Sequence, residues 1–313
     1  MVPAPSNPAD LPGVTARVSV LLPAYNAQAT LARCLAQLAN QSYRDWEAIL
    51  IDSSPGPECE QIVRGSFPDV SLIRSTRRLL PHEALNLGVQ ASHGELLAFL
   101  DPDAYPREHW LEHLVEAQDV YGGVIIGGVA CHGSRWVDLG AHLCKFDKWL
   151  PFGAARLLEE GPTVNYLLPR SLFDLHGPFD AGTRHADTHL SWRLRAARIP
   201  IRLEPSAVVE HHHLHSWGSL LVERFDRGEG FGRTRLQWVP VPRSRLVWFL
   251  PASVLPLRLL TQLGRVWNNA RSAHMSWTFM LTFPVLSSGL YAWLLGESAT
   301  YLRQLLRGRS VAE

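Results

Sequence analysis

Two aspartates separated by one proline, Asp101-Pro102-Asp103, directly follow the run Glu95-Leu-Leu-Ala-Phe-Leu100. A short apolar run of this kind predicts a strand that is buried in a parallel sheet. Side chains just past the carboxyl end of such a strand lie where open α/β sheets bind ligands. Two carboxylates at this spacing can hold a Mg²⁺ ion that also contacts substrate phosphates. Asp-Pro-Asp is also favourable turn chemistry, so the motif alone leaves a plain turn open.

Polar side chains also end two earlier predicted strands. The string Val18–Asn26 closes with Pro-Ala-Tyr-Asn, whose ring and amide suit stacking and hydrogen bonding to a base or ribose. Asp52 ends the second strand and could accept a hydrogen bond from a ribose or base, or form an Asx turn with Ser53 and Ser54. Neither GxGxxG nor GxxxxGK[ST] occurs, which weakens the dinucleotide-binding and P-loop interpretations.

Two candidates lie further along the chain. Asp187 begins a predicted helix, where the helix dipole favours an ionised carboxylate, although a plain N-cap is the alternative. Four histidines within His211–His215 indicate either a metal contact or a solvated loop. Imidazole suits Zn²⁺ better than Mg²⁺. A zinc hydrolase, however, lacks support from an HExxH motif or a partner carboxylate at ligand spacing.

Strands and helices alternate over the first half of the chain, which predicts right-handed βαβ units and a mostly parallel α/β sheet flanked by helices. The expected strands are 17–23, 47–52, 70–74, 95–100 and 124–129, and the expected helices are 30–38, 83–91 and 107–120. Later segments predict an extended stretch at 161–168, helices at 187–197 and 220–231, and short strands at 199–203 and 207–210.

The composition allows a large core, since 46% of the 313 residues are apolar. The net charge of +1 gives no overall field that would point to nucleic acid. The four cysteines form no CxxC pair, so we expect buried free thiols in a reducing compartment. Residues 1–16 are expected to be a disordered lead-in, since the start of the chain is rich in proline. These residues also show no signal-peptide pattern.

The last part of the chain, 241–313, predicts a membrane-associated tail of apolar helices. Its uncharged stretch 246–257 is too short to cross a hydrocarbon core of roughly 30 Å, whereas the uncharged stretch 277–295 reaches the lower limit. The aromatic residues that suit a membrane interface are Trp277, Tyr291, Trp293 and Tyr301. The arginines that suit anionic head groups and a cytoplasmic face are Arg243, Arg245, Arg258, Arg265, Arg271, Arg303, Arg307 and Arg309. A pair of core helices or a dimer interface is the alternative.

In order and spacing, these motifs resemble the family 2 glycosyltransferases, which are nucleotide-sugar-dependent inverting enzymes of the GT-A fold. The strings that carry the resemblance are Val18–Asn26, the strand ending at Asp52, Ala84–Gly88, Gly94–Asp103, Phe173–Asp180 and Ala186–Arg193. The resemblance covers about residues 17–235 and implies a GT-A-like domain over 17–240. The stretch Trp293–Glu297 is similar to the membrane tail of many members.

The resemblance implies a role for each matching position. Asp187 matches the general base that deprotonates the acceptor hydroxyl. Asp103 and His211 match the ligands of a divalent cation, Mg²⁺ or Mn²⁺, with His212 or His213 as alternatives to His211. Asp101 would lie near the ribose and Asn86 near the diphosphate or donor sugar. Together with these two, the donor-binding positions are Pro23, Ala24, Tyr25, Asn26 and Asp52.

Three departures from the family pattern refine the expectation. The second acid that often follows the second strand is absent from Asp52-Ser53-Ser54-Pro55, which leaves the preferred base open. Ala186 replaces the usual glutamate before Asp187. The Gln-x-x-Arg-Trp string of processive synthases is missing, which favours transfer of one sugar per encounter.

We therefore expect a metal-dependent inverting glycosyltransferase that moves a sugar from a nucleoside-diphosphate sugar to an acceptor hydroxyl. Its acceptor would be a lipid-linked or cell-envelope glycan. The domain would lie at the cell membrane, on the cytoplasmic side. The alternatives are a non-catalytic nucleotide-sugar-binding scaffold and a nucleotidyltransferase on a similar sheet. Because every site residue precedes Pro242, a chain ending there is expected to be soluble and to bind nucleotide.

Overall fold

The computed structural model describes residues 16–213, 216–238 and 256–306. Within them the chain forms two compact units. Unit 1 contains 16–130, 154–182 and 186–212, and unit 2 contains 131–153, 183–185 and the described residues from 213 onward. Most of the predicted lead-in, His215 and nearly all of the stretch 246–257 lie outside the described residues.

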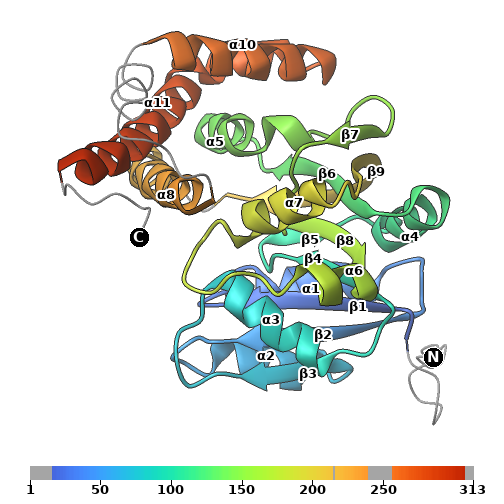
Figure 1. Cartoon of the computed structure of the whole chain (residues 1–313). Coiled ribbons are helices and arrows are strands. Elements are labelled where there is room, and N and C mark those ends of the chain that lie inside the picture. Colours follow the sequence, from blue (N-terminus) through green and yellow to red (C-terminus); the bar gives the residue numbers. More distant parts are fainter. Residues whose placement is uncertain (1–15, 214–215, 239–255, 307–313) are drawn as a thin grey trace. The chain divides into compact units, whose positions relative to one another are not determined.

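Unit 1 is built on a mixed sheet with the strand order β3-β2-β1-β4-β8-β6-β9-β5, and β7 pairs with β9 (Figure 1). The strands are β1 (Val18–Ala24), β2 (Trp46–Asp52), β3 (Val70–Arg74), β4 (Leu96–Leu100), β5 (Ala104–Pro106), β6 (Val124–His132), β7 (Arg156–Leu158), β8 (Asn165–Pro169) and β9 (Ile201–His212). The first four strands in the sheet order pair in parallel. In contrast, β8 is antiparallel to β4 and β6, and β9 is antiparallel to β5 and β7. The expected α/β sheet is confirmed, and it combines parallel with antiparallel pairs.

The helices of unit 1 lie between these strands in the chain. They are α1 (Leu31–Ala39), α2 (Glu58–Ser66), α3 (Pro81–Ala91), α4 (Trp110–Tyr121), α6 (Arg170–His176) and α7 (Ala186–Ala196). Helix α3 packs on β1 and β2, α1 packs on β5, and α4 packs on β9. Gly88 favours the close approach of α3, because a Cβ there would lie 2.7 Å from Cδ1 of Ile51 and would force that side chain to shift. The sequence analysis missed α2, α6, β5 and β7.

Strand β9 replaces the two short strands that the sequence predicts around Pro205. Residues 201–203 pair with β7 and residues 209–211 pair with β5. Pro205 falls between these two ladders, so its missing N–H interrupts neither of them. The extended backbone therefore continues through the proline, and β9 carries the first histidines of the run to the edge strand β5.

Asn165 links several elements of the sheet through a fully buried amide. Its Nδ2 donates to the carbonyls of Gly128 and Ala207, each at 2.9 Å. Its Oδ1 accepts from Nε1 of Trp110 at 2.7 Å. Since a buried amide without partners would be costly, these bonds allow Asn165 to fix β6, β8, β9 and α4 together.

Unit 2 is helical: α5 (Trp136–Phe146), the 3₁₀ turn η2 (Asp147–Trp149), α8 (Trp217–Trp238), α10 (Pro256–Ser272) and α11 (Ser276–Leu306). Helix α11 packs along α8 and α5, and α10 packs against α11 and η2. The core of this unit includes Leu143, Leu150, Val266, Leu286 and Leu290. The sequence analysis anticipated α8 in part and α11 as its stretch 277–295, but it missed α5.

Helix α11 is, among the described residues, the one helix long and apolar enough to cross a membrane. Nearly half of its most apolar window is buried inside the protein. Its first half nevertheless exposes large apolar side chains, with Trp277 81% and Leu281 70% exposed, alongside Met280 and Phe283.

Several residues assigned to the membrane interface instead have partners inside unit 2. Tyr301 is buried and donates to Oε1 of Glu297 at 2.6 Å, and the Arg224 guanidinium lies 4.4 Å above the Trp293 ring. Among the arginines, Arg258 and Arg265 pair with Glu297 and Asp147, and Arg303 pairs with Glu229. These side chains are therefore held by protein contacts. Arg243, Arg245, Arg307 and Arg309 lie outside the described residues.

Candidate active site

The Asp101-Pro102-Asp103 segment leaves β4 and turns directly into β5. The Ala104 N–H donates to the Asp101 carbonyl at 3.0 Å, which closes the turn. Ala104 then pairs with His211 across the β5–β9 ladder, and the His212 N–H donates to the Asp103 carbonyl at 2.8 Å. This register brings Nε2 of His211 to 3.6 Å from Oδ1 of Asp103. One ligand atom from each of Asp101, Asp103 and His211 lies within 4.8 Å of the other two.

The structure distinguishes the three histidines that the sequence left as alternatives. His211 is buried beside the two aspartates. His212 instead contacts Tyr105, with its Nδ1 3.0 Å from the tyrosine hydroxyl. His213 belongs to unit 2. In unit 1, His211 is therefore the histidine that faces the aspartate pair.

The donor set of this cluster fits a divalent cation. Two carboxylates suit Mg²⁺ or Mn²⁺, and the imidazole makes the set more favourable for Mn²⁺ than an all-oxygen site would be. The buried Cys34 thiol behind the cluster donates to the Asp101 carbonyl across 3.8 Å. Burial raises the pKa of the Cys34 thiol, and the nearby charges of Asp103 and Asp101 raise it further.

The end of β1 exposes two of the four predicted donor-binding residues of its Pro-Ala-Tyr-Asn turn. Tyr25 and Asn26 are exposed, whereas Pro23 and Ala24 are buried within the strand. The Arg78 guanidinium lies 4.2 Å above the Tyr25 ring, an arrangement that the sequence analysis missed. Asn26 has a positive φ of 53°. Tyr25 and Arg78 are therefore available to contact a ligand, while Pro23 and Ala24 contribute to the shape of the strand end.

Asp52 has local partners for its carboxylate. It pairs with Arg74, and its Oδ1 accepts from the Ser54 N–H at 2.9 Å. Its side chain is 0% exposed. This is the Asx turn named as the alternative, supported by an ion pair. In this structure Asp52 positions Arg74 and the following loop, and a direct donor contact would require its carboxylate to become exposed.

Asn86 also has both ends of its amide occupied. Its Nδ2 donates to the Phe179 carbonyl at 2.9 Å, and its Oδ1 accepts from the Phe179 N–H at 3.0 Å. Phe179 in turn packs on His82, with ring centroids 4.9 Å apart. Asn86 therefore ties α3 to the segment after α6. The predicted contact with the diphosphate or donor sugar would compete with these two bonds.

Asp187 lies in the first turn of α7. Its Oδ1 accepts from the Thr188 N–H at 2.8 Å and lies 4.0 Å from Nε2 of His82. The same His82 nitrogen is 3.3 Å from the Thr163 hydroxyl. The side chain of Asp187 is 17% exposed, so it is partly accessible. The sequence analysis missed His82 because a single histidine near a helix start carries no pattern that marks a partner.

Comparisons with known proteins agree on one family. Residues 19–182, just over half of the chain, match Glycosyl transferase family 2. Glycosyltransferase AglE of Haloferax volcanii is 25% identical over 223 residues, which cover 68% of this chain and 72% of the relative. The pre-mycofactocin glycosyltransferase of Mycobacterium tuberculosis is 28% identical over 214 residues, and the match covers 64% of this chain but only 44% of that relative.

A solved structure shares the fold. The mannosyltransferase PcManGT from Pyrobaculum calidifontis, in complex with GDP-Man and Mn²⁺, superposes with a TM-score of 0.54 and 18% sequence identity. The superposition covers 96% of this chain and 78% of that chain. The expected GT-A-like architecture is therefore confirmed. Since the family match spans more than half of the sequence, this chain belongs to glycosyl transferase family 2.

Proposed function

We propose that this glycosyltransferase is metal-dependent and inverting, and that it transfers a sugar from a nucleoside-diphosphate sugar to an acceptor hydroxyl. The observation that carries the proposal is the convergence of Asp101, Asp103 and His211 within 4.8 Å at the end of β4. Asp187, a partly exposed carboxylate, belongs to the same unit. The two groups provide a cation site and a base, which this reaction requires.

Each group has a distinct part in the proposed reaction. Asp103 and His211, with Asp101 beside them, would hold Mg²⁺ or Mn²⁺, which offsets the charge that develops on the leaving diphosphate. Asp187 accepts the proton of the acceptor hydroxyl as its oxygen attacks the anomeric carbon from the face opposite the diphosphate. One displacement of this kind inverts the anomeric configuration. His82, 4.0 Å from Asp187, helps to orient the carboxylate.

The proposal extends to the membrane and to the acceptor. The exposed apolar side chains of Trp277, Met280, Leu281 and Phe283 on α11 support attachment to a cell membrane, since a large apolar surface is costly in water. Nucleotide sugars are made in the cytosol, which favours a cytoplasmic position for the site. A lipid-linked or cell-envelope glycan is then the acceptor class that the enzyme meets most readily.

A donor panel tests the function. The purified full chain is mixed with UDP-, GDP- and dTDP-sugars, with Mn²⁺ or with a chelator, and its thermal unfolding is followed. A donor at about 100 times its dissociation constant should stabilise the protein by about 2.7 kcal/mol, and only when the metal is present. When a membrane lipid extract is added as the source of acceptor, the enzyme should transfer the sugar and release free nucleoside diphosphate from the donor. Donor binding that is as strong with the chelator as with Mn²⁺ would contradict metal dependence. Donor binding without release of nucleoside diphosphate would favour a non-catalytic nucleotide-sugar-binding scaffold.

The stereochemistry needs a separate measurement. An NMR spectrum of the glycosylated product reports the anomeric configuration of the transferred sugar. The proposal expects a configuration opposite to that of the donor. A retained configuration would rule out a single displacement assisted by Asp187.

A further inference from the structure

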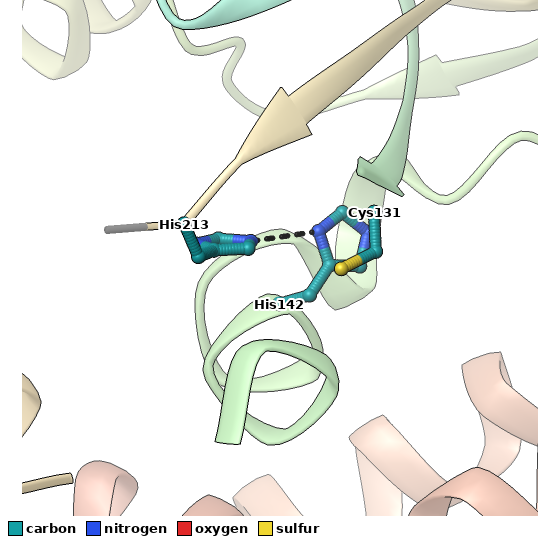
Figure 2. A group of neighbouring side chains, drawn as sticks. All are labelled: Cys131, His142 and His213. Atoms are coloured by element: carbon teal, nitrogen blue, oxygen red, sulfur yellow. Dashed lines mark hydrogen bonds between the residues drawn. The ribbon is translucent and has the colours of Figure 1, made fainter. Parts of the chain in front are cut away.

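A second group of metal-ligating side chains lies in unit 2. It consists of Cys131, His142 and His213, and one ligand atom from each lies within 4.8 Å of the other two. Cys131 comes from the end of β6, His142 from α5, and His213 directly follows β9. Figure 2 shows the Cys131 sulfur beside the His142 ring, and a nitrogen of the His213 ring pointing toward a nitrogen of the His142 ring. The family-level function makes no use of this group.

The spacing of the two imidazoles matches that of neighbouring ligands on one metal ion. Nδ1 of His142 lies 3.2 Å from Nε2 of His213. In a tetrahedral zinc site, bond lengths of about 2.0–2.1 Å to nitrogen and about 2.3 Å to sulfur place two nitrogens about 3.3 Å apart and nitrogen and sulfur about 3.6 Å apart. The nitrogens are thus already at ligand spacing. A small movement of the cysteine side chain would bring the sulfur to the same centre.

The surroundings suit a fixed site. His142 is 0% and His213 is 1% exposed, while Cys131 is half-buried. Phe146 packs against both imidazoles, with ring centroids 5.4 Å from His142 and 6.0 Å from His213. Packing of this kind holds ligand rings in place before the metal binds.

The donor chemistry differs from that of the aspartate cluster. One thiolate and two imidazoles favour Zn²⁺ and related borderline or soft ions over Mg²⁺ and Mn²⁺, which prefer oxygen ligands. We infer that Cys131, His142 and His213 form a zinc-type metal site, separate from the cation site at Asp101, Asp103 and His211. Binding deprotonates the Cys131 thiol and releases that proton to the solvent, and a water molecule completes the tetrahedral coordination.

Such a site would stabilise unit 2. The metal would join segment 131–153, through Cys131 and His142, to His213, which lies 71 residues after His142 along the chain. A ligand that binds only the folded chain stabilises it in proportion to its affinity and concentration. The competing interpretation is that the two imidazoles share only the N–H···N hydrogen bond drawn in Figure 2.

Metal substitution distinguishes these two interpretations. The full chain is stripped with a chelator and titrated with Co²⁺ and, separately, with Zn²⁺ under reducing conditions. We expect a thiolate-to-cobalt charge-transfer band in the near ultraviolet and one tightly bound Zn²⁺ per chain. Both should persist in Asp103→Asn and in Cys144→Ala, which removes a buried thiol two residues after His142 on the same helix. Cys131→Ser should abolish the band, and His142→Gln should weaken zinc binding at least about tenfold.

Thiol labelling of the wild-type chain provides a readout that does not depend on a variant folding. Iodoacetamide should modify the half-buried Cys131 in the stripped protein, and Zn²⁺ should protect it. The buried Cys34, Cys59 and Cys144 serve as internal references. Absence of a thiolate band in the wild type, an unchanged band in Cys131→Ser, or equal labelling of Cys131 with and without Zn²⁺ would each overturn the inference.

Discussion

Nε2 of His211 lies 3.6 Å from Oδ1 of Asp103, and the antiparallel pairing of β5 with β9 creates this contact. Ala104, the residue after Asp103, is the register partner of His211. A one-residue shift in register would turn His211 to the opposite side of the sheet, because side chains alternate along a strand. The cation site therefore depends on the register of this short edge strand as much as on the aspartates themselves.

Replacing Asp103 by asparagine should remove one negative ligand while keeping the shape of the side chain. We expect transfer activity to fall at least about 100-fold, the usual effect of losing one electrostatic contact to the leaving group. Titration with Mn²⁺ should show weaker binding. Asp69→Asn, at an exposed aspartate in a turn, is the matched control. If Asp103→Asn keeps near-normal turnover in the presence of a chelator, Asp103 is not the metal ligand.

Asp187→Asn should distinguish a role of Asp187 as general base from a role in donor binding. Because a positioned general base contributes about 10²- to 10⁴-fold, turnover should fall by that factor. Donor affinity, measured by the thermal shift with donor and Mn²⁺, should stay close to that of the wild type. Asp174→Asn, at an exposed aspartate on α6, provides the control. A variant that loses donor affinity but keeps its rate would place Asp187 in the donor site instead.

The aspartate pair was predictable because it depends on local sequence. A buried apolar strand followed by Asp-Pro-Asp specifies both the strand end and its carboxylates, and β4 ends at Leu100 as expected. The choice of His211 over His212 and His213 was not predictable in this way. It follows from the β5–β9 register, and β5 is a three-residue strand that leaves no periodic pattern.

The sequence also could not predict which side chains would find their partners on distant segments. Asn86 and Asp52 occupy expected positions, but their bonds to Phe179 and Arg74 depend on tertiary packing. Similarly, Cys131 and His142 meet His213 from a distant segment, and the three show no metal-binding spacing along the chain. Local motifs determine at which end of a strand or helix a polar side chain lies, whereas tertiary packing determines which residue it contacts.

The expectation that a chain ending near Pro242 is soluble needs revision. Such a chain lacks α10 and α11, whose Val266, Leu286 and Leu290 form one core with Leu143 and Leu150. Removing them would expose the apolar side of segment 131–153. Nucleotide binding could survive in unit 1, but we expect aggregation through the uncovered part of unit 2.

Two glycines of α8 provide a paired test of the helix packing in unit 2. A Cβ on Gly228 would lie 2.0 Å from the Trp293 carbonyl oxygen of α11, whereas a Cβ on Gly218 would meet nothing within 4 Å. Alanine normally favours a helix over glycine, so Gly218→Ala should leave the stability unchanged or slightly increase it. Gly228→Ala should lower the free energy of unfolding by about 1–3 kcal/mol through overpacking. Thermal unfolding of the two purified variants makes the comparison, and equal melting temperatures would contradict the close α8–α11 contact.

The membrane proposal can be tested on the exposed apolar side of α11, where Met280 is 58% and Leu281 is 70% exposed. Contacts between arginines and lipid weaken in salt, but inserted apolar side chains do not. The full chain should therefore stay with membranes in high salt and be released by detergent. Complete release of the wild type by salt alone would reduce the tail to a peripheral electrostatic anchor.

A charged double variant sharpens this test. Charged side chains are costly within a bilayer, so Met280→Glu with Leu281→Glu should move the protein largely into the soluble fraction. The control is Leu175→Glu, at a residue on α6 of unit 1 that is 74% exposed and therefore equally accessible to water. It should leave the membrane fraction unchanged. If both variants partition like the wild type, the apolar side of α11 does not face lipid and instead covers a protein surface.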